Sequence, residues 1–227
     1  TTEAPGHTRL RVIAGAPSAT GTYRLDLAIA SFARRHLWLT DAYFVGTAAY
    51  VQALAAAARD GVDVRLLVPG ASDIPALSPL SRAAYRPLLQ AGVRVFEWNG
   101  TMLHAKTAVA DGFWARVGST NLNIASWMGN YELDVAIEDA AFAARMTADF
   151  EADLSRATEI VLTRRNRVRP TEEGRRTGVA RRAMSGSAGR AAAGAVSVGS
   201  ALGAALTGRR VLGPAEGGLL AKFGVAV

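Results

Sequence analysis

Short apolar runs alternate with amphipathic stretches along residues 1–163. Runs rich in β-branched and aromatic residues predict strands at residues 9–15, 36–44, 62–69, 93–98 and 132–138. Apolar residues at helical spacing predict helices at residues 23–35, 47–59, 81–91 and 140–158. Strands that alternate with helices favour the α/β class, so we predict an α/β sandwich in which helices flank a mixed, largely parallel β-sheet.

A hairpin is predicted where two further apolar runs, residues 103–110 and 113–117, flank Asp111 and Gly112. Asp-Gly between apolar segments is a strong short-range signal for a hairpin, so Asp111 is interpreted as structural from this pattern alone. The second run ends at Gly118-Ser119-Thr120-Asn121 and returns these residues toward the beginning of the first run.

Four polar groups are expected to converge at the open end of this hairpin: the imidazole of His104, the ammonium of Lys106, the hydroxyl of Ser119 and the carboxamide of Asn121. His104 and Lys106 are two residues apart, which places both side chains on one face of a strand. The set suits a phosphate, because it offers donors for the oxygens and a nucleophile for the phosphorus. The simpler interpretations are a buried strand histidine, an exposed lysine and ordinary turn residues. Lys106 is one of two lysines beside 24 arginines, and its apolar neighbours disfavour an exposed position.

The pattern His104-x-Lys106-x4-Asp111-x6-Gly118-Ser119-x-Asn121 resembles the signature of the phospholipase D superfamily, and the continuation through residue 134 resembles its bacterial cardiolipin synthase branch. The resemblance covers about residues 9–163. It implies a phospholipase D-like sandwich and transfer or hydrolysis at a phospholipid phosphodiester, with a phosphatidylglycerol-like substrate. No metal or cofactor is expected.

The resemblance also implies residue roles. His104 would attack phosphorus and form a phosphohistidine, and Lys106 would hold a non-bridging oxygen. Ser119 and Asn121 would donate to phosphate oxygens. Glu132 occupies the position of a carboxylate that orients the nucleophile's other ring nitrogen, and Asp111 completes the catalytic set of the signature.

Enzymes of this family build their site from two signatures, with the second histidine as general acid. This chain carries one, because His36 is followed two residues later by Trp38 and not by a lysine. We therefore expect the other signature to come from a missing N-terminal half or from a second copy of the chain. The start at Thr1, directly before a strand that resembles the opening of the second half of cardiolipin synthases, favours the first arrangement.

The charge separates the chain into two parts. Residues 1–163 carry 14 Lys+Arg against 16 Asp+Glu, net −2, and residues 164–227 carry 12 against 3, net +9. We interpret 1–163 as the catalytic domain and 164–227 as a basic, weakly apolar tail, either membrane-associated or disordered. A basic segment beside apolar stretches suits an anionic membrane, which predicts peripheral association with the cytoplasmic side of a bacterial cell membrane.

Three functions remain open from the sequence. The first is a phosphatidyltransferase of the cardiolipin synthase type. The second is a phosphodiesterase or nuclease that acts as a homodimer, although the acidic balance of residues 1–163 makes nucleic acid an unlikely partner. The third is a membrane-binding fragment without activity. The absence of cysteine excludes thiol chemistry, and three histidines are few for a histidine-rich metal site. Tyr43 and Phe44 are expected in the core, with a substrate groove as the alternative.

Overall fold

The computed structural model describes residues 8–71, 77–163 and 167–171, so the predicted tail lies almost wholly outside the described residues. The strands are β1 Arg9–Gly15, β2 His36–Thr40, β3 Asp63–Pro69, β4 Arg94–Trp98, β5 Thr107–Ala110, β6 Trp114–Gly118, β7 Glu132–Glu138, β8 Ala157–Leu162 and β9 Val168–Pro170. The helices are α1 Gly21–Phe32, α2 Ala48–Arg59, α3 Leu77–Gln90, α4 Ile124–Met128 and α5 Ala140–Leu154.

The described strands form one sheet in the order β1-β7-β6-β5-β2-β3-β4-β8-β9. Only β2 with β3 and β3 with β4 pair in parallel, and the other neighbours are antiparallel. The predicted mixed sheet is confirmed, but the expectation that it is largely parallel is wrong. Parallel pairs need a long crossover, which α2 and α3 supply, whereas the turn at Asp111 and Gly112 forces antiparallel pairing.

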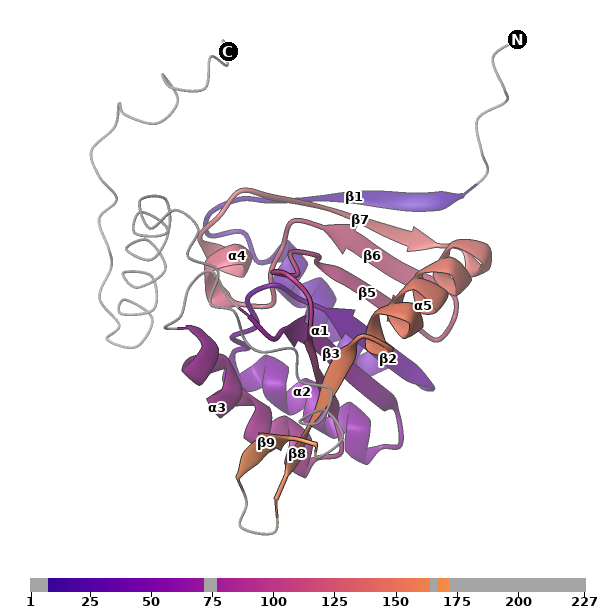
Figure 1. Ribbon diagram of the computed structural model, residues 1–227. Coiled ribbons are helices and arrows are strands. Elements are labelled where there is room, and N and C mark those ends of the chain that lie inside the picture. The colour runs from indigo at the N-terminus through magenta and orange to yellow at the C-terminus, as the bar shows by residue number, and fades with distance from the viewer. Residues whose placement is uncertain (1–7, 72–76, 164–166, 172–227) are drawn as a thin grey trace, which may run out of the picture.

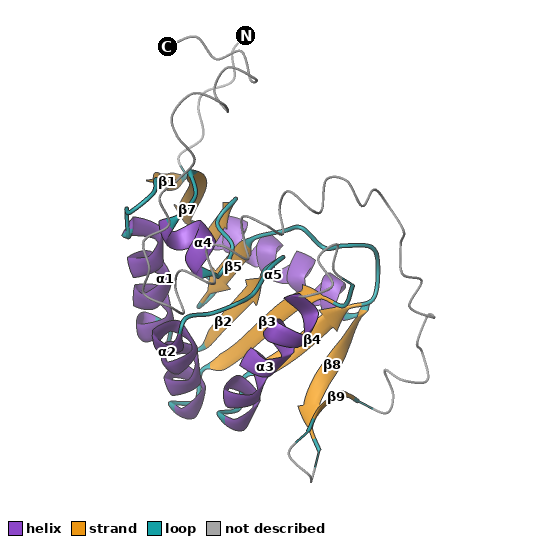
Figure 2. Cartoon of the chain, turned by 90° about the vertical axis from the view of Figure 1, so that its left-hand side faces the viewer, coloured by secondary structure: helices purple, strands orange, loops and turns teal. Residues whose placement is uncertain are grey.

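Helices cover the two faces of the sheet unequally (Figures 1 and 2). Alternate strand residues such as Leu39 of β2 and Leu66 of β3 pack with α1, α2 and α3 in the larger core. Residues one position away, such as Trp38 and Leu67, pack against α5 in a smaller core on the opposite face. This three-layer arrangement is the predicted sandwich.

Several elements are shorter than the runs that predict them. The run at 36–44 stops as a strand at Thr40, because the side chain of Asp41 accepts a hydrogen bond from the backbone N–H of Tyr43 and turns the chain. The run at 103–110 is strand only from Thr107. The helix predicted over 140–158 ends at Leu154, and the β-branched segment after it forms β8.

The sheet continues beyond Thr163, where the sequence places the start of the tail. Val168–Pro170 forms β9, and this strand pairs with β8 through Leu162 and Val168 at one end and Ile160 and Pro170 at the other. Across residues 8–71, 77–163 and 167–171, no helix has the length and apolar character needed to cross a bilayer.

Candidate active site

The strand registers bring four chain segments to one end of the sheet. Thr40 at the end of β2 pairs with Thr107 at the start of β5, and Thr107 pairs with Val117 of β6. Gly118 pairs in turn with Asp134, near the start of β7. Four segments are therefore neighbours: the one after β2, the one before β5, the one after β6 and the start of β7. Most of the predicted site residues belong to these segments.

His104 and Lys106 lie in the irregular segment before β5, so the prediction that both belong to a strand is wrong. They remain close, because Nζ of Lys106 donates a hydrogen bond of 2.7 Å to the carbonyl oxygen of His104. His104 is exposed, whereas Lys106 is 6% exposed. Burial lowers the pKa of Lys106, and the negative charges of Asp41 and Glu132 act in the opposite direction. An accessible imidazole thus lies beside a shielded ammonium.

Tyr43 approaches both residues from the segment after β2. Its ring centroid is 5.6 Å from that of His104 in an edge-on arrangement, and Nζ of Lys106 is 6.0 Å from the Tyr43 centroid. The neighbouring Phe44 is 1% exposed and belongs to the core, as expected. Of the two aromatic residues, Tyr43 is therefore the one beside the candidate site, which agrees with the alternative interpretation for this pair and not with the core position that was favoured.

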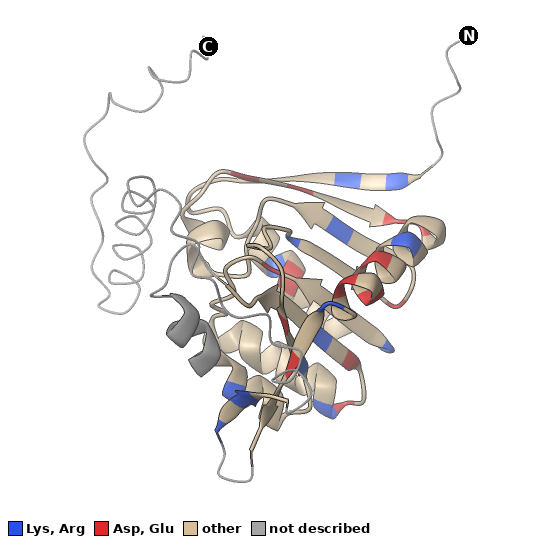
Figure 3. Ribbon diagram, viewed as in Figure 1, with Lys and Arg blue, Asp and Glu red and all other residues tan. Residues whose placement is uncertain are grey.

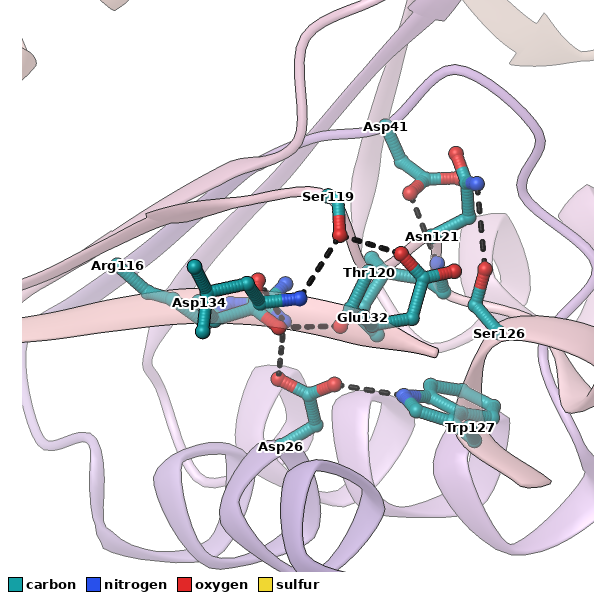
Figure 4. Close-up of polar contacts among 12 residues, drawn as sticks. Asp26, Asp41, Arg116, Ser119, Thr120, Asn121, Ser126, Trp127, Glu132 and Asp134 are labelled. Atoms are coloured by element: carbon teal, nitrogen blue, oxygen red, sulfur yellow. Dashed lines mark hydrogen bonds and ion pairs between the residues drawn. The ribbon is translucent and has the colours of Figure 1, made fainter. Parts of the chain in front are cut away.

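Ser119 connects the segment after β6 to the start of β7 (Figure 4). Its hydroxyl donates a hydrogen bond to the carboxylate of Glu132 and accepts one of 3.0 Å from the backbone N–H of Leu133. The side-chain amide of Asn130 donates to the other oxygen of Glu132 at 3.1 Å. The Glu132 carboxylate is held in this way at the same end of the sheet as Lys106, on whose pKa its charge acts.

Asn121 follows Ser119 and turns its side chain toward α4. Nδ2 donates to Oγ of Ser126 at 3.3 Å, and Oδ1 is buried without a hydrogen-bond partner in the described part of the chain. The predicted donor therefore lies at the site, with its amide group engaged by a neighbouring hydroxyl.

Asp111 is separated from the other predicted residues. It lies at the opposite end of β5, at the turn to β6, with φ of 53° followed by 71° at Gly112. Its carboxylate accepts hydrogen bonds from the backbone N–H groups of Arg34, Arg35 and His36 at 2.8–3.2 Å. Its interpretation as a structural turn residue fits this position, and its membership of the catalytic set stays a prediction.

Asp41 is a site residue that the sequence reasoning missed. Its side chain is fully buried, accepts a 2.8 Å hydrogen bond from the backbone N–H of Leu122 and a 3.0 Å bond from that of Tyr43. Burial raises the pKa of Asp41 to about 7, although both backbone donors and the charges of Arg116 and Lys106 lower it. An aspartate inside an apolar run, followed by an aromatic pair, was the available signal.

A buried ion network supports the Ser119–Asn121 segment from below the sheet (Figure 4). Arg116 of β6, with 1% of its side chain exposed, forms ion pairs with Asp26 at 3.3 Å and Asp134 at 3.6 Å. Asp134 accepts a hydrogen bond from the hydroxyl of Thr120, and Asp26 accepts one of 2.7 Å from the indole N–H of Trp127. Burial raises the pKa of Asp26, and Arg116 opposes that shift. The network joins β6, β7, α1 and α4 beneath the site.

No group of three or more His, Asp or Glu side chains suited to a metal ion occurs among the residues that the structure describes.

A family model described as the PLD-like domain of cardiolipin synthase matches residues 27–154. Cardiolipin synthase A of Proteus mirabilis is 37% identical over 163 residues, which are 70% of this chain and 33% of that protein. The Klebsiella pneumoniae protein of the same name is 34% identical over 157 residues, 68% of this chain and 32% of that protein. The chain therefore spans about a third of the length of these curated relatives.

Solved structures share the fold. Nuc of Salmonella typhimurium, described as a phospholipase D family member, aligns with a TM-score of 0.59 and 21% identity over 67% of this chain and 99% of its own. Phosphatidylserine synthase of Haemophilus influenzae aligns with a TM-score of 0.55 and 14% identity over 70% of this chain and 41% of its own. Both confirm the α/β sandwich predicted from the alternation of strands and helices.

Proposed function

The chain belongs to the phospholipase D-like family that includes cardiolipin synthases, and from this we propose that it supplies one half of a site for phosphatidyl transfer through a phosphohistidine intermediate. The observation that carries the proposal is the meeting of His104, Lys106 and the Ser119–Glu132 pair at one end of the sheet. Relatives at 34–37% identity are named cardiolipin synthase A, which supports a phospholipid as the substrate.

In the proposed first step, a nitrogen of the His104 imidazole attacks the phosphorus of the phosphodiester. A P–N bond forms, the P–O bond to the leaving alcohol breaks, and a general acid protonates the leaving oxygen. The exposure of His104 leaves its ring accessible to a lipid headgroup. In the second step the same group, now a base, takes the proton of an acceptor alcohol while the alcohol oxygen attacks the phosphorus. The P–O bond forms, the P–N bond breaks and the imidazole is released; with water, the outcome is hydrolysis.

Lys106 would stabilise the negative charge that increases on the non-bridging oxygens in the transition state. Its burial supports this role, because a charge interaction is stronger where water is excluded. Ser119 and Glu132 would act together. The hydroxyl of Ser119, which donates to the carboxylate of Glu132, would turn and donate to a bound phosphate instead. Orientation of His104 by Glu132 is part of the same proposal.

Asn121 requires one rearrangement to serve as a donor. A half-turn of its amide would let the hydroxyl of Ser126 donate to Oδ1, which is buried without a partner in the described part of the chain. Nδ2 would then be available for a phosphate oxygen.

This sequence contains one His-x-Lys signature. The general acid is proposed to come from a second such signature, supplied by a preceding half or by a second copy of the chain. A homodimeric phosphodiesterase is the second candidate function, favoured by the presence of one signature in a chain that aligns with the full length of Nuc. A bacterial membrane is the proposed place of action, with the basic C-terminal residues as its contact.

Replacing His104 by Asn tests the mechanism. Measured in an assembly that contains two signatures, the change removes the nucleophile and keeps a similar size. Headgroup release from phosphatidylglycerol vesicles should therefore fall to background, and label from a phosphorus-labelled lipid should no longer remain on the protein. His36→Asn is the matched control, because His36 lies at the other end of the sheet, and it should retain both signals. Full activity in His104→Asn would refute the phosphohistidine route, and DNA cleavage measured in parallel would favour the phosphodiesterase.

A further inference from the structure

Asp41 connects two segments that carry site residues. One carboxylate oxygen accepts the backbone N–H of Tyr43 and the other accepts that of Leu122, next to Asn121. Two further hydrogen bonds join the same segments. The side-chain amide of Asn123 donates to the carbonyl oxygen of Tyr43 at 2.9 Å, and the backbone N–H of Val45 donates to the carbonyl oxygen of Leu122 at 3.2 Å. The carboxylate is therefore part of the frame that holds Tyr43 against His104.

The groups that interact electrostatically with Asp41 belong to three other segments of the chain. Lys106 lies before β5, Arg116 lies on β6, and the buried Tyr50 of α2 responds to the negative charge of Asp41. Both cations stabilise the ionised carboxylate, yet burial outweighs them and raises the pKa of Asp41 to about 7. The protonation state of Asp41 is therefore sensitive to any further charge placed near it.

We propose that Asp41 is a proton-linked positioning residue, which fixes the Tyr43 and Leu122–Asn123 segments and takes up a proton when an anionic phosphodiester binds beside Lys106. The inference rests on the proposed function for the location of the anion.

The physical basis is competition for one cation. Ionised Asp41 and a bound phosphodiester both carry negative charge near Lys106, and a like charge disfavours ionisation. Anion binding should therefore raise the pKa of Asp41 further. By linkage, ionisation of Asp41 as the pH rises through about 7 should weaken anion binding. The two backbone donors remain bonded when one oxygen is protonated, because each oxygen keeps a lone pair for its N–H.

Dimethyl phosphate is a suitable probe, because it keeps one negative charge through the neutral range. We expect the affinity of the wild-type chain to fall by about threefold or more between about pH 6 and about pH 8. In Asp41→Asn this decrease should be absent or clearly smaller, whatever the absolute affinity. Asp63→Asn is the matched control. Asp63 begins β3 opposite His36, away from the site, and accepts hydrogen bonds from the side chains of Trp38 and Arg65, so the variant should keep the wild-type slope.

Lysine NMR gives a second readout that needs no activity. The chain has two lysines, Lys106 and Lys222, so two side-chain signals are expected. Asp41 raises the pKa of Lys106, and its replacement by Asn should lower the Lys106 titration midpoint while leaving that of Lys222 unchanged. An unchanged Lys106 midpoint, or a wild-type pH slope of anion binding in Asp41→Asn, would overturn the proposal.

Calorimetry of the unmodified chain keeps the test valid if Asp41→Asn does not fold. Dimethyl phosphate binding near pH 7, measured in two buffers of different ionisation enthalpy, should show proton uptake, and His104→Asn should show it as well. Loss of the uptake in His104→Asn would assign the proton to the imidazole and refute the role of Asp41. Activity retained by His104→Asn would instead refute the proposed function and leave the proton link intact.

Discussion

The carboxylate of Asp111 accepts hydrogen bonds from three consecutive backbone N–H groups at the start of β2, those of Arg34, Arg35 and His36. Partial burial raises the pKa of Asp111, but these donors together bring it below its usual value. A carboxylate with a lowered pKa stabilises the fold above its unfolded-state pKa, and that stabilisation is lost as the pH falls through the folded-state pKa. At the residue scale, Asp111 therefore stabilises the contact between the hairpin turn and the start of β2.

Replacing Asp111 by Asn should separate stability from catalysis. Asn tolerates the positive φ of this turn but lacks the charge, so the free energy of unfolding should fall by about 1–2 kcal/mol at pH 7. Thermal unfolding at several pH values measures this, and the difference from wild type should vanish in acid, where Asp111 is protonated. A loss of headgroup release without a loss of stability would support the membership of Asp111 in the catalytic set.

At the element scale, the hairpin and its neighbours were predictable and the irregular segments were not. Asp111 and Gly112 gave the β5–β6 turn correctly, because Asp-Gly has its own preference for positive φ. The run ending at residue 110 did not reveal that the strand starts at Thr107, since apolar composition does not report how Lys106 bonds to the His104 carbonyl. The role of Asp41 depends on Leu122, 81 residues away, which no local pattern contains.

Gly118 shows why the end of β6 needs a residue without a side chain. A Cβ atom at this position would lie 1.9 Å from Oδ1 and 2.7 Å from Cα of Asp134 on β7. The Asp134 carboxylate cannot move freely, because it is buried, pairs with Arg116 and accepts a hydrogen bond from Thr120. The close approach of β6 and β7 at the site therefore depends on Gly118.

Replacing Gly118 by Ala should destabilise the fold by about 2 kcal/mol or more, because the clash involves backbone as well as side chain. The same change should disturb Ser119 and reduce activity. Gly21→Ala is the matched control, since a Cβ there would meet nothing within 4 Å and the residue opens α1. Denaturant unfolding of both variants measures the difference, and equal midpoints would show that β6 and β7 adjust without cost.

At the scale of the whole molecule, one His-x-Lys pair predicts an incomplete site. A general acid contributes about 100-fold to 10,000-fold to such a reaction, so a monomer of this chain should turn over phosphatidylglycerol at least about 100-fold more slowly than an assembly with two signatures. Size-exclusion chromatography with light scattering, followed by an activity assay on each fraction, tests this. An active monomer would contradict the requirement for a second histidine.

The net charge of the sheet domain differs from that of the residues that follow it. Acidic residues outnumber basic ones along α5, and the ribbon in Figure 3 shows residues of both charges distributed over the described elements. The eight basic residues beyond Thr171 outnumber three acidic ones, Glu172, Glu173 and Glu216, which gives net +5. Each basic residue near an anionic bilayer contributes about 1 kcal/mol, so this segment is the proposed membrane contact.

Truncation after Thr171 should remove binding to phosphatidylglycerol vesicles while leaving the fold intact. This position preserves β9, whose pairing with β8 would be lost in a cut at residue 163. Binding of the intact chain should weaken with salt, because the Debye length falls from about 10 Å at 0.1 M to about 3 Å at 1 M. Vesicle flotation of both forms measures the effect, with neutral phosphatidylcholine vesicles as the control. If the truncated chain floats as well as the intact one, the sheet domain itself binds the membrane and the basic segment is not the contact.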